Sequence, residues 1–276
     1  MRVIAPDGGT GALATDRPDP FSRPPPAARR PRRPRVLAHM GRWGRARRWL
    51  PPVARRVLDV GCASAYGTAA LAGTDGRRLI GIERDHAAVL EAARRRPWLT
   101  VLEGDASALP VADGVADAVT MLDVLEHLED PRAAIAEAHR VLAPGGCLVV
   151  SVPHRGALHG LDALNLYDGL CRDRPGLPPL AAPTTSGGHA HHHYTVEECE
   201  QLLRPWFTVE RVARRGLGIH ELITLGLLAM RRRGGRPRTA RALLGLYVVV
   251  YLLEDALPTG PVAYHLMLRA RAVTPA

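Results

Sequence analysis

The chain alternates between short apolar runs and helical segments through its middle, and this alternation constrains the fold more than any other feature. Runs rich in Val, Ile and Leu predict buried strands at residues 55–60, 77–83, 98–105, 116–122 and 146–153. Segments of helical character lie between them, at residues 64–72, 85–95 and 131–142. Two later runs, residues 207–212 and 263–268, complete the set. Because strands that alternate with helices pair in parallel, we expect an α/β fold with a doubly wound, mostly parallel, seven-stranded sheet.

Three residues mark helix starts in this pattern. Asp85 stands where an N-cap is expected, and Pro131 occupies a first helical turn. Thr195 is followed three residues later by Glu198, which is the capping-box pattern for a helix over residues 195–206.

Composition divides the chain into segments. Residues 1–38 combine many Pro and Arg with few apolar residues, which predicts a disordered tail. The α/β domain is expected over residues 39–215, and it contains a Gly-, Pro- and His-rich stretch, residues 154–193, that we interpret as a lid. Residues 216–276 form an apolar and basic extension that we expect to complete the sheet.

Charge is unevenly distributed along the chain. All 37 basic residues are arginine, and the formal net charge is +10. The balance is +9 over residues 1–48, −7 over residues 53–200 and +8 over residues 201–276. A nucleic-acid-binding core would carry its basic face within the fold, so an acidic middle argues against a nucleic-acid partner.

The longest apolar stretch, residues 242–253, is followed by Glu254 and Asp255. It is shorter than the roughly 20 residues that cross a bilayer. Two interpretations stay open: a buried strand or helix, and a segment that lies on a membrane surface. The first 20 residues lack a secretory apolar run, and the four cysteines form no CxxC pair, so we expect a cytoplasmic protein without a structural metal site.

Acidic residues fall where three of the predicted strands end. Asp59, Glu83 and Asp105 close the first, second and third strands. In an open parallel sheet, ligands bind beyond the carboxyl ends of the strands. A carboxylate at Glu83 can accept hydrogen bonds from both hydroxyls of a ribose, and Asp105 can accept one from an exocyclic amine such as that of adenine.

The turn after the first strand discriminates between two adenine-containing cofactors. Gly61 permits a tight turn where backbone N–H groups can approach a ligand, but the glycines of a GxGxxG pyrophosphate motif are absent in this register. Asp59 just before the turn repels an anion and attracts an ammonium or sulfonium group. The signs of the charges therefore favour S-adenosylmethionine over NAD.

Four stretches carry a family resemblance: RVLDVGCASAYG, LIGIERD, VLEGDASALPVADGVADAVTMLDVLEHLEDP and HRVLAPGGCLVVSVP. Their order resembles the successive motifs of class I S-adenosylmethionine-dependent methyltransferases, over about residues 50–215. The resemblance is strongest to the broad group that methylates quinone precursors, natural products and sugars. It implies a Rossmann-like class I fold and S-adenosyl-L-methionine as cofactor.

The resemblance assigns roles to individual residues. It places Asp59 and Gly61, with the turn residues Cys62 and Ala63, beside the methionine portion of the cofactor, and Glu83, followed by Arg84, on the ribose. Asp105 and the backbone of Ala106 are expected at the adenine, and Asp123 begins the segment that faces both cofactor and acceptor. The chain departs from the family where Ala63 and Ala65 replace the second and third glycines of the first motif. We expect these methyl groups to narrow the pocket slightly.

Transfer from a sulfonium needs mainly proximity, alignment and a dry site. A general base is needed only when the acceptor is a hydroxyl or a similar group held as its acid. The catalytic candidates are His154, which follows the fifth strand, and His127; His159, His193 and Asp123 are further candidates.

Side chains near the predicted lid are candidates for acceptor contact. His193 and Tyr194 are expected to border the acceptor pocket where the lid rejoins the core, and Tyr66 is expected to cover the cofactor. The cluster at residues 189–193 consists of His189, His191, His192 and His193 around Ala190, and we expect no functional metal there.

The sequence therefore favours a methyltransferase that acts on a small-molecule or a lipid- or sugar-linked acceptor. No NPPY-like tetrad follows the fourth strand, which favours O- or C-methylation over an amine target. A NAD-dependent Rossmann oxidoreductase and a non-catalytic interaction protein of the same fold are the alternatives. The basic ends suggest peripheral contact with an anionic membrane.

Overall fold

The computed structural model describes residues 17–28, 41–72, 76–163, 166, 192–232 and 237–273. The strands are β1 (Arg56–Val60), β2 (Arg78–Glu83), β3 (Thr100–Glu103), β4 (Ala116–Leu122), β5 (Leu142–Pro153), β6 (Phe207–Arg215) and β7 (His265–Ala272). The helices are α1 (Gly41–Trp49), α2 (Tyr66–Leu71), α3 (His86–Arg95), α4 (Pro131–Val141), α6 (Val196–Leu203), α7 (Ile219–Arg232) and α8 (Pro237–Ala256). Single 3-10 turns are η3 (Leu125–His127), η4 (His159–Leu161) and η5 (Gly260–Val262).

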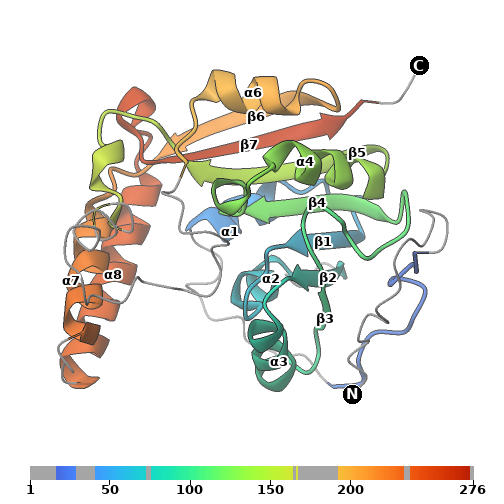
Figure 1. The fold of residues 1–276 in the computed structure, drawn as a ribbon, viewed down its shortest axis with the longest axis horizontal. Coiled ribbons are helices and arrows are strands. Elements are labelled where there is room, and N and C mark those ends of the chain that lie inside the picture. The colour runs from blue at the N-terminus through green and yellow to red at the C-terminus, as the bar shows by residue number, and fades with distance from the viewer. Residues whose placement is uncertain are drawn as a thin grey trace.

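All seven strands belong to one sheet, in the order β3-β2-β1-β4-β5-β7-β6 (Figure 1). The first five strands of the chain pair in parallel, and β7 runs antiparallel between β5 and β6. The expected doubly wound, mostly parallel, seven-stranded sheet is thus confirmed. The strand order reverses direction at β1 and β4, which is the point where open α/β sheets bind ligands.

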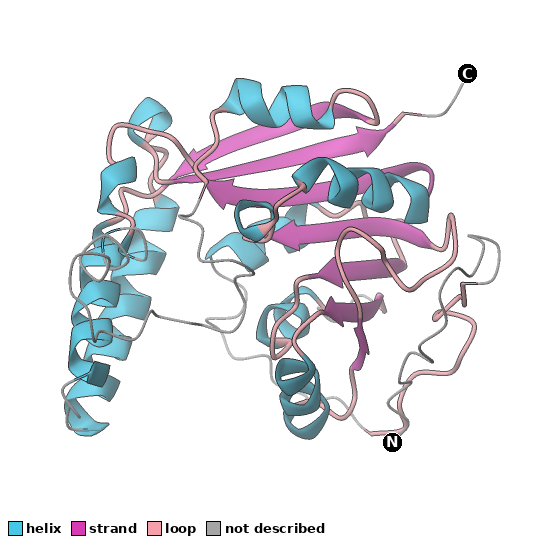
Figure 2. Cartoon of the chain, in the orientation of Figure 1, coloured by secondary structure: helices cyan, strands magenta, loops and turns pink. Residues whose placement is uncertain are grey.

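Helices cover both faces of the sheet because its strands are apolar on both sides (Figure 2). Leu58 and Val60 of β1 join the core that contains α4 and α6, whereas Val57 joins the core that contains α1, α2 and α3. Asp59 stands on the same face of the strand as Val57, because side chains alternate along a strand.

The predicted helix caps are present. The Asp85 side chain accepts a hydrogen bond from the N–H of Ala87 at the start of α3. Thr195 and Glu198 form the reciprocal capping box of α6. These caps fix the helix starts within a residue of where the sequence predicts them.

Part of the predicted N-terminal tail is packed on the domain, so the prediction of disorder over residues 1–38 is wrong for residues 17–28. Phe21 is 9% exposed and belongs to the main core. The guanidinium of Arg17 donates to Glu137 at 3.0 Å, and Arg78 donates to the carbonyl of Pro20 at 3.0 Å. One buried aromatic ring and paired arginines offset the ordering cost that the Pro-rich composition suggests.

The apolar stretch 242–253 lies in α8. Helix α8 packs against α7, and the two form a hairpin at the left side of the molecule in Figure 1. The expectation of a buried element holds for one face only. Tyr251 is 7% exposed, but Leu246 is 50% exposed and Leu253 is 65% exposed.

Two buried carboxylates fix the base of this hairpin. Asp255 accepts two hydrogen bonds from the guanidinium of Arg45 in α1, at 2.8 and 2.9 Å. Glu254 accepts hydrogen bonds from the N–H groups of Leu217, Gly218 and His220 at the start of α7. Acidic groups are favourable at a helix N-terminus, so α7 and α8 are tied together and to the domain.

Candidate cofactor and acceptor site

The predicted acidic residues lie together at the carboxyl edge of the sheet. Asp59 and Glu83 are at the ends of β1 and β2, which are paired neighbours. Asp105 follows β3, and Asp123 follows β4. Because β3, β2, β1 and β4 are consecutive in the sheet, their carboxylates line one continuous rim.

The turn after β1 has a conformation that favours glycine. Gly61, Ala63 and Ala65 have positive φ angles of 72°, 47° and 60°. Alanine at such an angle is strained by roughly 1–2 kcal/mol relative to glycine. The departure of Ala63 and Ala65 from the family pattern therefore introduces backbone strain at this turn.

Hydrogen bonds within the protein already occupy the first N–H groups of this turn. The carbonyl of Ile82 accepts from the N–H groups of Gly61 and Cys62, at 2.8 and 3.1 Å. The N–H of Ala63 donates to the Glu83 carboxylate at 2.8 Å. In this conformation these backbone groups therefore have partners within the protein. They fix the shape of the turn.

Asp59 is buried below this turn, with 4% of its surface exposed. Its two carboxylate oxygens accept hydrogen bonds from the hydroxyls of Thr68 in α2, at 2.5 Å, and Thr120 in β4, at 2.6 Å. Burial raises the pKa of Asp59 to about 6, and the two hydroxyls only partly oppose this effect. A cation bound nearby would favour the ionised form.

Glu83 is oriented by the backbone on both sides. One carboxylate oxygen accepts from Ala63 and the other accepts from the N–H of Asp85, at 2.9 Å. Each carboxylate oxygen keeps further acceptor capacity, so the group is held in place and can still receive two hydroxyls.

Asp105 is more exposed than Asp59 and Asp123. Its side chain is 42% exposed, accepts from the N–H of Ser107 at 2.7 Å, and lies 3.8 Å from the guanidinium of Arg84. Ala106 beside it is nearly buried.

Cys62, in the turn after β1, is buried as well. Its sulfur packs where a side chain at Gly81 would stand, which marks it as a packing residue of the turn.

Asp123 links the rim to α1 and to β5. Its φ angle is 57°, and its carboxylate accepts from the Ser151 hydroxyl at 2.6 Å and pairs with the guanidinium of Arg42 at 2.7 Å. Burial is the largest single influence on the pKa of Asp123, and it acts to raise that pKa. The charged and hydrogen-bonding neighbours together outweigh burial and lower the pKa below its ordinary value, and the Arg42 charge contributes most to this lowering.

The predicted cover of the site, Tyr66, stands at the start of α2 and is 42% exposed. Trp43 of α1 packs edge-on against it, with ring centroids 6.0 Å apart. The Arg42–Asp123 ion pair and this aromatic contact together tie α1 to the end of β4 and to α2.

The two catalytic candidates have different surroundings. His154 is buried, and its Nδ1 lies 3.0 Å from the carbonyl of Ala263, which makes Nδ1 the protonated nitrogen. Burial lowers its pKa. His127 ends η3 and lies near enough to Asp123 to lower the pKa of that carboxyl.

The predicted acceptor residues lie at the start of the described segment that follows the lid. Tyr194 is buried and its hydroxyl donates to the carbonyl of Leu125 at 3.2 Å. His193 is buried and its Nε2 lies 2.9 Å from a carboxylate oxygen of Asp162. His189, His191 and most of the lid, residues 167–191, lie outside the described residues.

Several polar residues of this region were missed by the sequence analysis. Glu126 is 7% exposed, and burial, with the charge of Asp123, raises its pKa well above the ordinary value. Within the part of the chain that the structure describes, one of its carboxylate oxygens is buried without a hydrogen-bond partner, as are Nδ1 of His193 and Nε2 of His265. Glu126 lies in the motif that contains Asp123 and His127, so the motif could have identified it. His265 has no comparable signal, because only the antiparallel pairing of β7 brings it here.

Comparison with known proteins tests the resemblance. The family described as "Methyltransferase domain" matches residues 58–150. A demethylmenaquinone methyltransferase of Beutenbergia cavernae is 33% identical over 187 residues, which are 64% of this chain and 72% of that protein.

The chain belongs to the S-adenosylmethionine-dependent methyltransferases.

A second member, a probable S-adenosylmethionine-dependent methyltransferase of Mycolicibacterium smegmatis, is 39% identical over 101 residues, 37% of this chain. The match spans only 39% of that relative's length. A solved S-adenosylmethionine-dependent methyltransferase of Mesorhizobium loti shares the fold, with a TM-score of 0.53 and 21% identity over 85% of this chain and 99% of that one.

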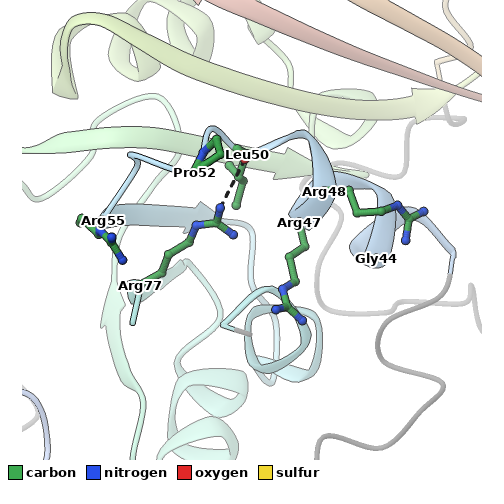
Figure 3. A pocket seen from close by; sticks show the side chains of 7 residues that line it. All are labelled: Gly44, Arg47, Arg48, Leu50, Pro52, Arg55 and Arg77. Atoms are coloured by element: carbon green, nitrogen blue, oxygen red, sulfur yellow. Dashed lines mark hydrogen bonds between the residues drawn. The ribbon is translucent and has the colours of Figure 1, made fainter. Parts of the chain in front are cut away.

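This methyltransferase also has a pocket of about 600 Å³ away from the acidic rim. It is lined by Gly44, Arg47, Arg48, Leu50, Pro52, Arg55 and Arg77 (Figure 3). Arg55 and Arg77 immediately precede β1 and β2, so the pocket lies at the amino edge of the sheet. None of the predicted site residues lines it.

Backbone strain at Ala63 gives a first testable prediction. Ala63 is exposed, so Ala63→Gly should relieve the positive φ angle without loss of packing and raise the free energy of unfolding by about 1 kcal/mol. Ala87→Gly, at an exposed position inside α3, is the matched control and should lower it. Urea denaturation measures both. A destabilised Ala63→Gly variant would contradict the strained turn.

The buried carboxylate gives a second prediction. The pKa of Asp59 is raised from 3.8 to about 6, so ionised Asp59 opposes folding above pH 6 by on the order of 3 kcal/mol, and this penalty disappears as the pH falls toward 4. Asp59→Asn should therefore be more stable than the wild type at pH 7.5, and the difference should shrink by pH 4.5.

Thr68→Val is the control for this prediction, because it removes a hydrogen bond that favours the ionised form. It should lower stability at pH 7.5. Urea denaturation at both pH values measures the three proteins. A stability difference between wild type and Asp59→Asn that is independent of pH would show that Asp59 has an ordinary pKa.

Proposed function

We propose that this protein transfers a methyl group from S-adenosyl-L-methionine to a small-molecule or a lipid- or sugar-linked acceptor, at oxygen or carbon. The observation that carries the proposal is the rim of carboxylates around the turn after β1, with Asp59, Glu83 and Asp105 at the ends of consecutive strands. A dinucleotide pyrophosphate would meet negative charge there, whereas a sulfonium and an ammonium group are attracted.

The residues present fit this cofactor. Glu83 is held with acceptor capacity to spare, and Asp105 is open enough to receive an amine. The raised pKa of Asp59 gives the site a buried group whose ionised form a bound cation stabilises. When bound, the cofactor supplies an activated methyl group.

The remaining work of the chain is to align the acceptor and to exclude water. Trp43 and Tyr66 cover the turn, and Arg42 holds α1 against Asp123. The buried atoms without partners on Glu126, His193 and His265 are groups that an acceptor can satisfy.

Among the histidines, His193 suits the role of a base best. Its Nε2 faces the Asp162 carboxylate at 2.9 Å, and its Nδ1 has no hydrogen-bond partner among the described residues. If the acceptor is a hydroxyl, Nδ1 can take the proton while Asp162 stabilises the imidazolium. His154 donates through Nδ1 to a carbonyl, which leaves only its Nε2 for this role.

The relative from Beutenbergia cavernae is named a demethylmenaquinone methyltransferase, which supports a small organic acceptor. The proposal includes a cytoplasmic location with peripheral contact at an anionic membrane, supported by the basic balance at both ends of the chain.

Cofactor binding tests the proposal. Titration calorimetry should detect S-adenosylmethionine and S-adenosylhomocysteine but not NAD. Glu83→Gln and Asp105→Asn should each weaken binding about tenfold or more, because each loses a hydrogen bond to a charged acceptor. Glu210→Gln is the control, since this exposed carboxylate pairs with Arg269 and Arg271 on the far strands and should bind as the wild type does.

Two outcomes would contradict the proposal at different levels. If both variants bind as tightly as the wild type, the residue assignment is wrong. If the wild type binds NAD in place of S-adenosylmethionine, the function is wrong. Labelled cofactor with acceptor extracts, followed by mass spectrometry of the product, then identifies the acceptor.

A further inference from the structure

An apolar stripe runs along the outer face of α8. Ala242, Leu246, Val249 and Leu253 are spaced by four, three and four residues, which places them on one side of a helix. Leu246, Val249 and Leu253 are 50%, 54% and 65% exposed, and Ala242 is exposed as well. Side chains of this size in a continuous exposed row mark an interaction surface.

The domain holds this stripe outward. The opposite side of α8 carries Tyr251, Glu254 and Asp255, all less than a tenth exposed. Asp255 pairs with Arg45 of α1, and Glu254 receives the first N–H groups of α7. Rotation of α8 to bury the stripe would break both of these contacts, so the stripe remains at the surface.

Positive charge continues the stripe toward the far end of the hairpin. Arg238 stands four residues before Ala242, on the same side of α8, and is exposed, as is Arg241. The sequence over residues 231–241 contains six arginines and no acidic residue. An apolar row that ends in arginines matches a surface that offers hydrocarbon and negative charge side by side.

We propose that the α7–α8 hairpin docks on the surface of an anionic lipid bilayer through this stripe and its arginines. The stripe enters the boundary of the acyl chains, and the arginines meet the phosphates. Among the helices of the described residues, none has the length and hydropathy to cross a bilayer, so the hairpin lies on the membrane. This surface defines a membrane contact more closely than the basic chain ends do, since the hairpin combines apolar contact with the acyl chains and charge contact with the phosphates.

The position of the hairpin gives the docking a consequence. Its base joins the end of β6 and the start of β7, and His265 at that start pairs with Pro153 at the carboxyl end of β5. The hairpin therefore stands beside the edge that carries the acidic rim (Figure 1). If the proposed function holds, docking places the acceptor site beside the bilayer; the docking itself does not depend on methyl transfer.

Vesicle sedimentation of the full chain tests the proposal. Vesicles of equal parts phosphatidylglycerol and phosphatidylcholine should pellet the wild type, and vesicles of phosphatidylcholine alone should pellet much less. The triple variant Leu246→Gln, Val249→Gln and Leu253→Gln should lose about tenfold or more in partitioning. The double variant Arg238→Gln and Arg241→Gln should bind more weakly, and its remaining binding should depend less on salt.

The matched control is Val53→Gln with Leu90→Gln, which removes exposed apolar residues, 81% and 42% exposed, outside the hairpin. It should pellet as the wild type does. S-adenosylhomocysteine should raise the melting temperature of every variant as it does that of the wild type. This result shows that folding and cofactor binding are intact, and it keeps the docking test separate from the test of the proposed function.

Three results would overturn the docking. In the first, the anionic vesicles do not pellet the wild type. In the second, the triple variant and the control bind equally. In the third, sedimentation velocity shows a wild-type dimer that the triple variant converts to monomer, which would assign the stripe to a second copy of the chain.

Discussion

The site depends on one buried carboxylate. Asp59 lies near the end of β1 inside the core, where the hydroxyls of Thr68 and Thr120 hold it. These bonds join β1 to α2 and to β4, so they set the place of the turn between them. Burial of this group works against folding at neutral pH, since it raises the pKa to about 6. A cationic ligand is attracted by the ionised Asp59 carboxylate and offsets the cost of its burial. Binding of the cofactor is therefore linked to the stability of the domain.

The charge distribution acquires a structural meaning from this arrangement. The acidic middle of the chain includes the rim at the carboxyl edge, where Glu83 also fixes the backbone of Ala63. Among the described arginines of the two basic segments, Arg17 and Arg42 form ion pairs with Glu137 and Asp123, and Arg238 and Arg241 stand on the outward hairpin. The net charge of +10 therefore adds together charged residues that act at different places in the structure.

The sheet and its acidic rim could be predicted because they depend on local patterns. Apolar runs, the Asp85 cap and the Thr195 capping box each act within a few residues. The buried environment of Glu126 and the contact of Arg42 with Asp123 could not be predicted, since they depend on segments that only the fold brings together.

Two errors have identifiable physical causes. Composition predicts disorder up to residue 38, yet Phe21 supplies enough apolar contact to order residues around it. In the same way, the run at 242–253 is apolar enough to be buried, but Asp255 and Glu254 fix α8 with its other face outward.

A crystal structure of the protein with S-adenosylhomocysteine would show whether the carboxylates at the ends of β1, β2 and β3 bind the cofactor. We expect the ribose hydroxyls within hydrogen-bond distance of the Glu83 carboxylate, the adenine amine at Asp105, and the sulfur near the turn above Asp59. Density for the ligand at the opposite edge of the sheet, among the arginines that line the pocket at Arg55 and Arg77, would contradict it.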